Sequence, residues 1–146
     1  MSVSIKIVGK ENNTDEYFAA KHLKEVLERG IDTKAIGEIF IHPSVTLFGQ
    51  AVKDIDIIVC GSLINYIPSL RVFDGEGSLS SQRVEIRDFC TVVELKNHSI
   101  SGIEREGSDF YVKYGESRKN VTAQSNKQKE ACKSFILSLQ NGITPY

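Results

Sequence analysis

Apolar and polar side chains follow regular patterns along most of the first half of this chain, and the patterns predict its elements. Alternation over residues 3–7 predicts a short strand. Apolar positions three and four apart predict a helix that runs to about residue 29, is capped by Asn13 or Thr14 and is closed by Gly30. Residues 36–41 and 52–60 are rich in β-branched side chains, so we expect two strands, the first ended by Pro43 and the second central.

The second half of the chain predicts further strands and one more helix. Residues 61–82 include a stretch rich in Gly and Ser, and we expect a long loop near the substrate. Residues 84–86 and 90–97 predict the next strand region, residues 100–104 and 110–114 a hairpin, and residues 120–139 the last helix. This order predicts an α+β or mixed α/β fold with a mixed sheet between helices.

Two of the predicted strands contain charges that a buried strand should not carry. Asp54 and Asp56 share one face of their strand, and Glu94 and Lys96 share one face of theirs, because successive side chains alternate. Burying such charges without partners costs several kcal/mol or more. We therefore expect them to meet each other, a metal ion, or both. Mg²⁺ prefers hard carboxylate oxygens, which makes Asp56 and Glu94 candidate ligands, with the Leu95 carbonyl as a third.

Each of these residues also has a purely structural explanation. Asp56 could lie on the wet face of an edge strand, and Glu94 with Lys96 could form an ion pair of little energetic value. Gln124 and Gln128 extend the apolar line of the last helix. They could point into a cleft or simply be exposed, and we expect Gln128 to be exposed.

Composition limits the classes of protein. A length of 146 residues predicts one domain, and the 25% of charged and 40% of hydrophobic residues are ordinary globular values. We expect no transmembrane helix and no secretion signal. The net charge of −1 provides no global positive field for nucleic acid. Three separated cysteines without zinc-ligand spacing (Cys60, Cys90 and Cys132) indicate buried thiols and a cytoplasmic location.

Several of these segments together resemble the nuclease-related domain (NERD) family of the PD-(D/E)XK nuclease superfamily. They are D-I-D-I-I-V at 54–59, V-E-L-K-N at 93–97, Gly102, and N-x-x-x-Q at 120–124, and the resemblance spans residues 16–139. It implies a restriction-endonuclease-like core, a mixed four-stranded sheet flanked by helices, and a Mg²⁺-dependent nuclease acting on DNA. The residues it implies are the metal ligands Asp56 and Glu94, the catalytic Lys96, Gln124 on the helix after the hairpin, and the first-helix acid Glu16.

Three functional hypotheses follow. The first is a single nuclease-like domain, residues 1–146, that hydrolyses DNA phosphodiesters with Mg²⁺ or Mn²⁺ through Asp56, Glu94, Lys96 and Gln124. The second is a catalytically inactive nuclease-like fold that binds nucleic acid or assembles with proteins, which the mild net charge favours. The third, a zinc-based or cysteine-based enzyme, lacks any supporting ligand or triad spacing. Homodimer formation and other partners stay open.

Overall fold

The chain forms an α+β protein in the computed structural model, which describes residues 2–50, 54–73, 78–96 and 100–140. Its helices and strands, in chain order, are β1 (Val3–Ile7), α1 (Asp15–Gly30), β2 (Ile36–Thr46), β3 (Asp54–Ile64), β4 (Ser69–Phe73), β5 (Leu79–Arg83), β6 (Asp88–Val93), the 3₁₀ helix η1 (Ile100–Gly102), β7 (Ile103–Glu106), β8 (Asp109–Tyr114), β9 (Ser117–Asn120) and α2 (Val121–Gln140).

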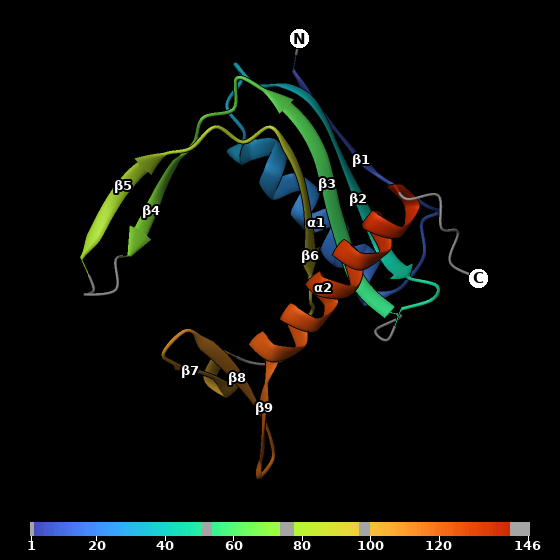
Figure 1. Cartoon of the computed structure of the whole chain (residues 1–146), viewed down its shortest axis with the longest axis vertical. Coiled ribbons are helices and arrows are strands. Elements are labelled where there is room, and N and C mark those ends of the chain that lie inside the picture. Colours follow the sequence, from blue (N-terminus) through green and yellow to red (C-terminus); the bar gives the residue numbers. More distant parts are fainter. Residues whose placement is uncertain (1, 51–53, 74–77, 97–99, 141–146) are drawn as a thin grey trace.

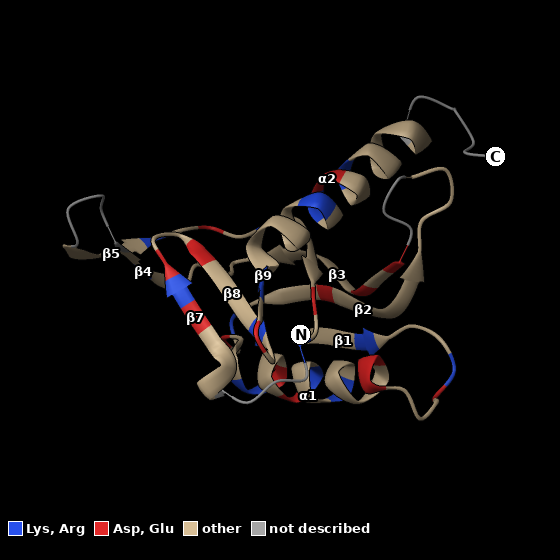
Figure 2. Ribbon diagram, turned by 90° about the horizontal axis from the view of Figure 1, so that it is seen from below, with Lys and Arg blue, Asp and Glu red and all other residues tan. Residues whose placement is uncertain are grey.

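A four-stranded mixed sheet, in the order β1-β2-β3-β6, is the centre of the molecule. Strands β1 and β2 are parallel, whereas β2 with β3 and β3 with β6 are antiparallel. Helix α1 lies against one face of the sheet and α2 against the other (Figures 1 and 2). The predicted mixed sheet between helices, with residues 54–60 in a central strand, is thus confirmed.

The two faces of β3 are covered by different helices. On one face Ile57 and Val59 are at most 4% exposed and pack in the cluster that contains Ala20 of α1. On the other face Ile58 packs against the cluster that contains Cys132 of α2. Asp56 lies near the start of β3, where it lines a small cavity together with Glu16 of α1.

Pro43 does not end β2, which continues to Thr46 and pairs with β3 on both sides of Ser44. The reason lies in which side of β2 the proline faces. Val8 N–H donates to the Ile41 carbonyl at 2.9 Å, so Ile41, and Pro43 two residues later, face the side of β1. Strand β1 pairs only as far as Ile41, so the missing N–H of Pro43 leaves no partner unpaired.

The long loop expected at residues 61–82 is wrong. Strand β3 continues to Ile64, and β4 pairs with β5 as a hairpin whose tip, residues 74–77, lies outside the described residues. The hairpin extends from the end of β3 opposite to Asp56, away from the candidate site (Figure 1). Residues 84–86 are not a strand, although the N–H groups of Val84 and Ile86 donate to the carbonyls of Pro68 and Tyr66.

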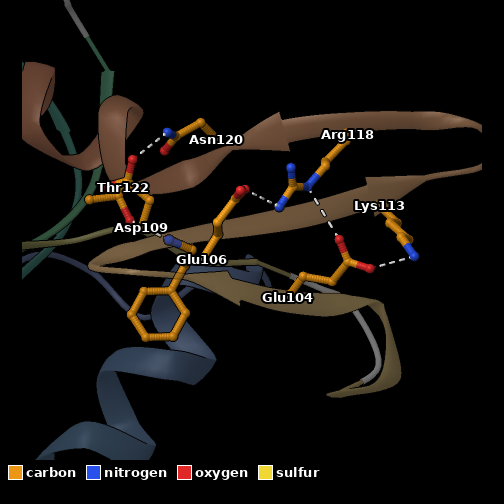
Figure 3. A network of polar contacts seen from close by, with 8 residues as sticks. Glu104, Glu106, Asp109, Lys113, Arg118, Asn120 and Thr122 are labelled. Carbon is orange, nitrogen blue, oxygen red and sulfur yellow. Dashed lines mark hydrogen bonds and ion pairs between the residues drawn. The ribbon is translucent and has the colours of Figure 1, made fainter. Parts of the chain in front are cut away.

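The predicted hairpin of residues 100–114 is confirmed as β7 and β8, and β9 adds an unpredicted third strand. This small sheet is fastened to the start of α2 (Figure 3). Asn120 Nδ2 donates to Asp109 Oδ2 at 3.0 Å, and Phe110 N–H donates to Thr122 Oγ1 at 2.8 Å. Asn120 Oδ1 also accepts from Ala123 N–H, which caps the helix and fixes where α2 begins.

Helix α1 begins as predicted, with Thr14 rather than Asn13 as its N-cap: Thr14 Oγ1 accepts from Tyr17 N–H at 3.3 Å. Helix α2 follows the predicted range, and its expected end near residues 141–142 lies outside the described part. Within the described ranges, neither helix is long and apolar enough to cross a membrane.

Candidate functional site

Asp56 and Glu94 come together at one end of the sheet, on neighbouring strands. The paired register of β3 and β6 ends with Ile57 opposite Val93, and Asp56 and Glu94 are the next residues of the two segments. The backbone N–H of Leu95 donates to Asp56 Oδ2 at 2.7 Å and ties the two segments together. Two carboxylates that are 38 residues apart in the sequence thus share one site.

The environment of Asp56 disfavours its ionised form. Burial is the largest cause and raises the pKa of this carboxyl above its usual range. The negative charges of Glu94 and Glu16 raise the pKa further, whereas the Leu95 N–H and the Lys96 ammonium oppose the shift. Like-charged carboxylates packed this closely are unfavourable in the apoprotein and would be stabilised by a cation.

Glu94 is the best-connected side chain of the site. It is 9% exposed and accepts from three donors. Lys96 Nζ and Gln124 Nε2 both donate to Oε1, and Gln128 Nε2 donates to Oε2. The structure therefore brings together all four residues that we singled out for catalysis, because Asp56 adjoins this network; their chemical roles stay predictions. Asn97, part of the same motif, lies outside the described residues.

The expected exposure of Gln128 is wrong, since this side chain is 3% exposed. Gln124, Gln128 and Cys132 follow one another at every fourth position of α2, so they form a single line that faces the sheet. The sequence signal for this arrangement was the spacing of four residues between Gln128 and Cys132, a cysteine that we expected to be buried. Gln128 Oε1 is buried and has no hydrogen-bond partner among the described residues.

The two carboxylates line two different cavities. One, of about 190 Å³, is lined by Asp56 together with Asp54 and Glu16. Glu16 therefore does reach the surroundings of Asp56, as the resemblance implied. The other cavity, of about 400 Å³, is lined by Glu94 and Lys96. Asp56 thus lines an acidic cavity, whereas Glu94 lines one that contains an ammonium group.

The second cavity continues into a groove between β6 and α2. A neighbouring cavity of about 530 Å³ shares Val92 and Ser125 with it and is also lined by Lys129 and Lys133. Glu94 is the one acid in the lining of these two cavities, against three lysines, since Lys96 also lines the second. A chain with a net charge of −1 therefore concentrates positive charge in this groove. The sequence did not indicate this groove, because Lys129 and Lys133 are far from the acidic motifs in the chain.

Carboxylate oxygens that protein hydrogen bonds leave free are the kind of ligand that a hard divalent cation would require here. A carboxylate has roughly four lone-pair positions, and the three donors on Glu94 leave one of them free, on Oε2. Asp56 Oδ2 accepts a hydrogen bond from the Leu95 N–H. The other carboxylate oxygen of Asp56 has no hydrogen bond to a described residue. The described residues contain no group of three or more His, Cys, Asp or Glu arranged to hold a metal. Mg²⁺ requires only one or two carboxylates because it keeps several waters.

Comparisons with known proteins identify no relative of this chain: no family model, no curated protein and no solved structure matches it.

Proposed function

We propose that this chain is a Mg²⁺-dependent nuclease that hydrolyses DNA phosphodiester bonds, with Mn²⁺ able to replace Mg²⁺. The observation that carries the proposal is the placement of Asp56, Glu94 and Lys96 at one end of neighbouring strands, with Glu94 held by three donors. A four-stranded mixed sheet between two helices supports a restriction-endonuclease-like core.

In this proposal Asp56 and Glu94 would hold the cation, through the oxygens that protein donors leave free. Bound Mg²⁺ would supply positive charge that activates water and stabilises the leaving oxygen. Lys96 lines the cavity beside Glu94, where its ammonium would neutralise charge that develops on the phosphate or orient the attacking water. Gln124 and Gln128 are positioning residues, because both act on Glu94 rather than on the substrate.

The groove beside the site supports a polyanionic substrate. Lys129 and Lys133 are four residues apart on α2, so both ammonium groups lie on the same side of the helix and line the same cavity. Thr122 and Ser125 add hydroxyl donors nearer to Glu94. Phosphate contacts of this kind position a nucleic acid without reading its sequence.

A second function, a catalytically inactive module that binds nucleic acid, is favoured by one observation. The oxygens of Glu94 already accept from three protein donors, which is also the arrangement of a purely structural carboxylate. In that case the groove would bind nucleic acid without a metal, and the phosphodiester would stay intact.

The deciding experiment incubates the full chain with end-labelled single-stranded, duplex and nicked DNA in Mg²⁺, Mn²⁺ or EDTA. We expect cleavage with either metal, none with EDTA, and none for Asp56→Asn. Asp88→Asn is the matched control, since Asp88 is an exposed carboxylate at the start of β6, outside the linings of both cavities beside the site. Cleavage by Asp56→Asn at an unchanged rate would refute the proposed role of Asp56 in holding the metal, and binding without cleavage by the unmodified chain would establish the inactive module.

A further inference from the structure

The three cysteines, separate in the sequence, form one cluster across β3, β6 and α2. Cys60 and Cys90 are directly opposite each other in the β3–β6 pair. Cys132, on α2, places its Sγ 4.0 Å from the Sγ of Cys90. This is van der Waals contact between two thiols that belong to different elements. The expectation of three buried thiols is wrong, since Cys60 is half-buried and Cys90 is exposed.

The two thiols in contact differ in their access to solvent. Cys132 is 6% exposed, whereas Cys90 is exposed and lines the groove of about 530 Å³. Lys129 and Lys133 line the same groove, so an anionic reagent would be attracted to Cys90. Burial and the neighbouring Cys132 raise the pKa of Cys90 to about 11, which keeps it a thiol at neutral pH and makes its reactions slow.

We propose that Cys90 and Cys132 are an oxidative modification site, which closes reversibly to a disulfide between β6 and α2 by exchange with a small disulfide such as oxidised glutathione. Cys90, once deprotonated, attacks one sulfur of the reagent, and the first glutathione thiol leaves with the proton. The Cys132 thiolate then attacks Cys90 Sγ in the mixed disulfide and releases the second glutathione thiol, which takes the second proton. Two protein thiols are oxidised, and one disulfide reagent is reduced to two thiols.

Closing this bond would fasten α2 to the sheet in its present register. Cys132 lies four residues beyond Gln128 on the same line of α2, and Cys90 shares its face of the β6 segment with Glu94. The disulfide would join residues 42 positions apart, which restricts the unfolded chain. The thiol chemistry is independent of the proposed nuclease activity, since it requires neither metal nor nucleic acid.

The test uses the full reduced chain, incubated overnight with oxidised glutathione at pH 8.5, where more Cys90 is ionised. Free thiols are then alkylated and the cysteines mapped by peptide mass spectrometry. We expect a Cys90–Cys132 linked peptide, alkylation at Cys60 alone, and a melting temperature higher by roughly 10 °C that dithiothreitol reverses. Cys60→Ser is the matched control and should form the same link.

Three results would overturn the proposal. They are three alkylated cysteines after the incubation, a link between Cys60 and Cys90, and a glutathione adduct on Cys90 that persists while Cys132 remains free. Cys132→Ser should stop at the glutathione adduct. All three contrary results can be read in the unmodified chain, so the proposal stays testable even where a substitution at buried Cys132 prevents folding.

Discussion

Removing Glu94 in two different ways separates its structural role from its proposed catalytic one. Glu94→Ala leaves three donors without their acceptor. Gln128, 3% exposed, would lose the partner of its amide, which costs about 1–3 kcal/mol. Half-buried Gln124 and the 21%-exposed Lys96 can turn towards water, so we assign them about 1 kcal/mol together. The total is about 3 kcal/mol, or a melting temperature lower by roughly 10 °C.

Glu94→Gln has the same shape and keeps most of these contacts. Its carbonyl oxygen accepts from Lys96 and Gln124, and its amide donates to Gln128 once the Gln128 amide turns over and presents Oε1, the oxygen without a partner. We therefore expect a loss of stability within about 1 kcal/mol. Cleavage should nevertheless disappear, because the substitution removes the negative charge that holds the cation.

Thermal melts in EDTA and single-turnover cleavage in Mg²⁺ measure the two effects. The expected pattern is a large fall in melting temperature for Glu94→Ala, a small one for Glu94→Gln, and no cleavage by either. A Glu94→Ala protein as stable as the unmodified chain would contradict the hydrogen-bond network. Cleavage by Glu94→Gln at an unchanged rate would refute the proposed metal role.

The same site supports three further predictions. Asp56→Asn should raise the melting temperature in EDTA at neutral pH, because the raised pKa of Asp56 makes its ionised form unfavourable in the folded protein. The stability of the unmodified chain falls as the pH rises through this raised pKa. In acid, where Asp56 is protonated, the advantage of the variant should vanish. Lys96→Ala should slow single-turnover cleavage about 10²-fold at saturating Mg²⁺ without weakening Mg²⁺ binding, and an unchanged rate would exclude its catalytic role. The double variant Lys129→Glu with Lys133→Glu should bind DNA with a weaker salt dependence, lower by about two released counterions, as measured by anisotropy in EDTA. Lys127→Glu, which lies outside the groove lining, should leave the salt dependence unchanged.

Much of the sheet could be predicted from the sequence because strands show local alternation, and the carboxylates were expected to meet because buried charges need partners. The parity of side chains on a strand assigned Asp56 and Glu94 to their faces before any tertiary contact was known. The alternation of side chains did not show which helix covers which face of the sheet. That assignment depends on packing between segments far apart in the chain.

The predictions that were wrong concern features that local alternation of side chains does not determine. Pro43 was expected to end β2. A missing N–H matters only where a neighbouring strand presents a carbonyl that would accept its hydrogen bond, and β1 does not reach Pro43. Strand β5 was missed because all its residues are exposed, and a strand without a buried face shows no hydrophobic alternation. The cysteine cluster was missed because it forms across β3, β6 and α2, through pairings that no local spacing encodes.

Two features of the site are unfavourable in the protein alone. Asp56 is an acid whose surroundings disfavour its charge, and Gln128 buries an oxygen that no described residue satisfies. A structural ion pair explains neither, since an apolar pair at these positions would avoid both penalties. A cation beside Asp56 would relieve the first, and an ordered water from its hydration shell could donate to Gln128 Oε1 and relieve the second. That each feature would be relieved by a bound species is the physical reason to regard this end of the sheet as a binding site rather than as part of the scaffold.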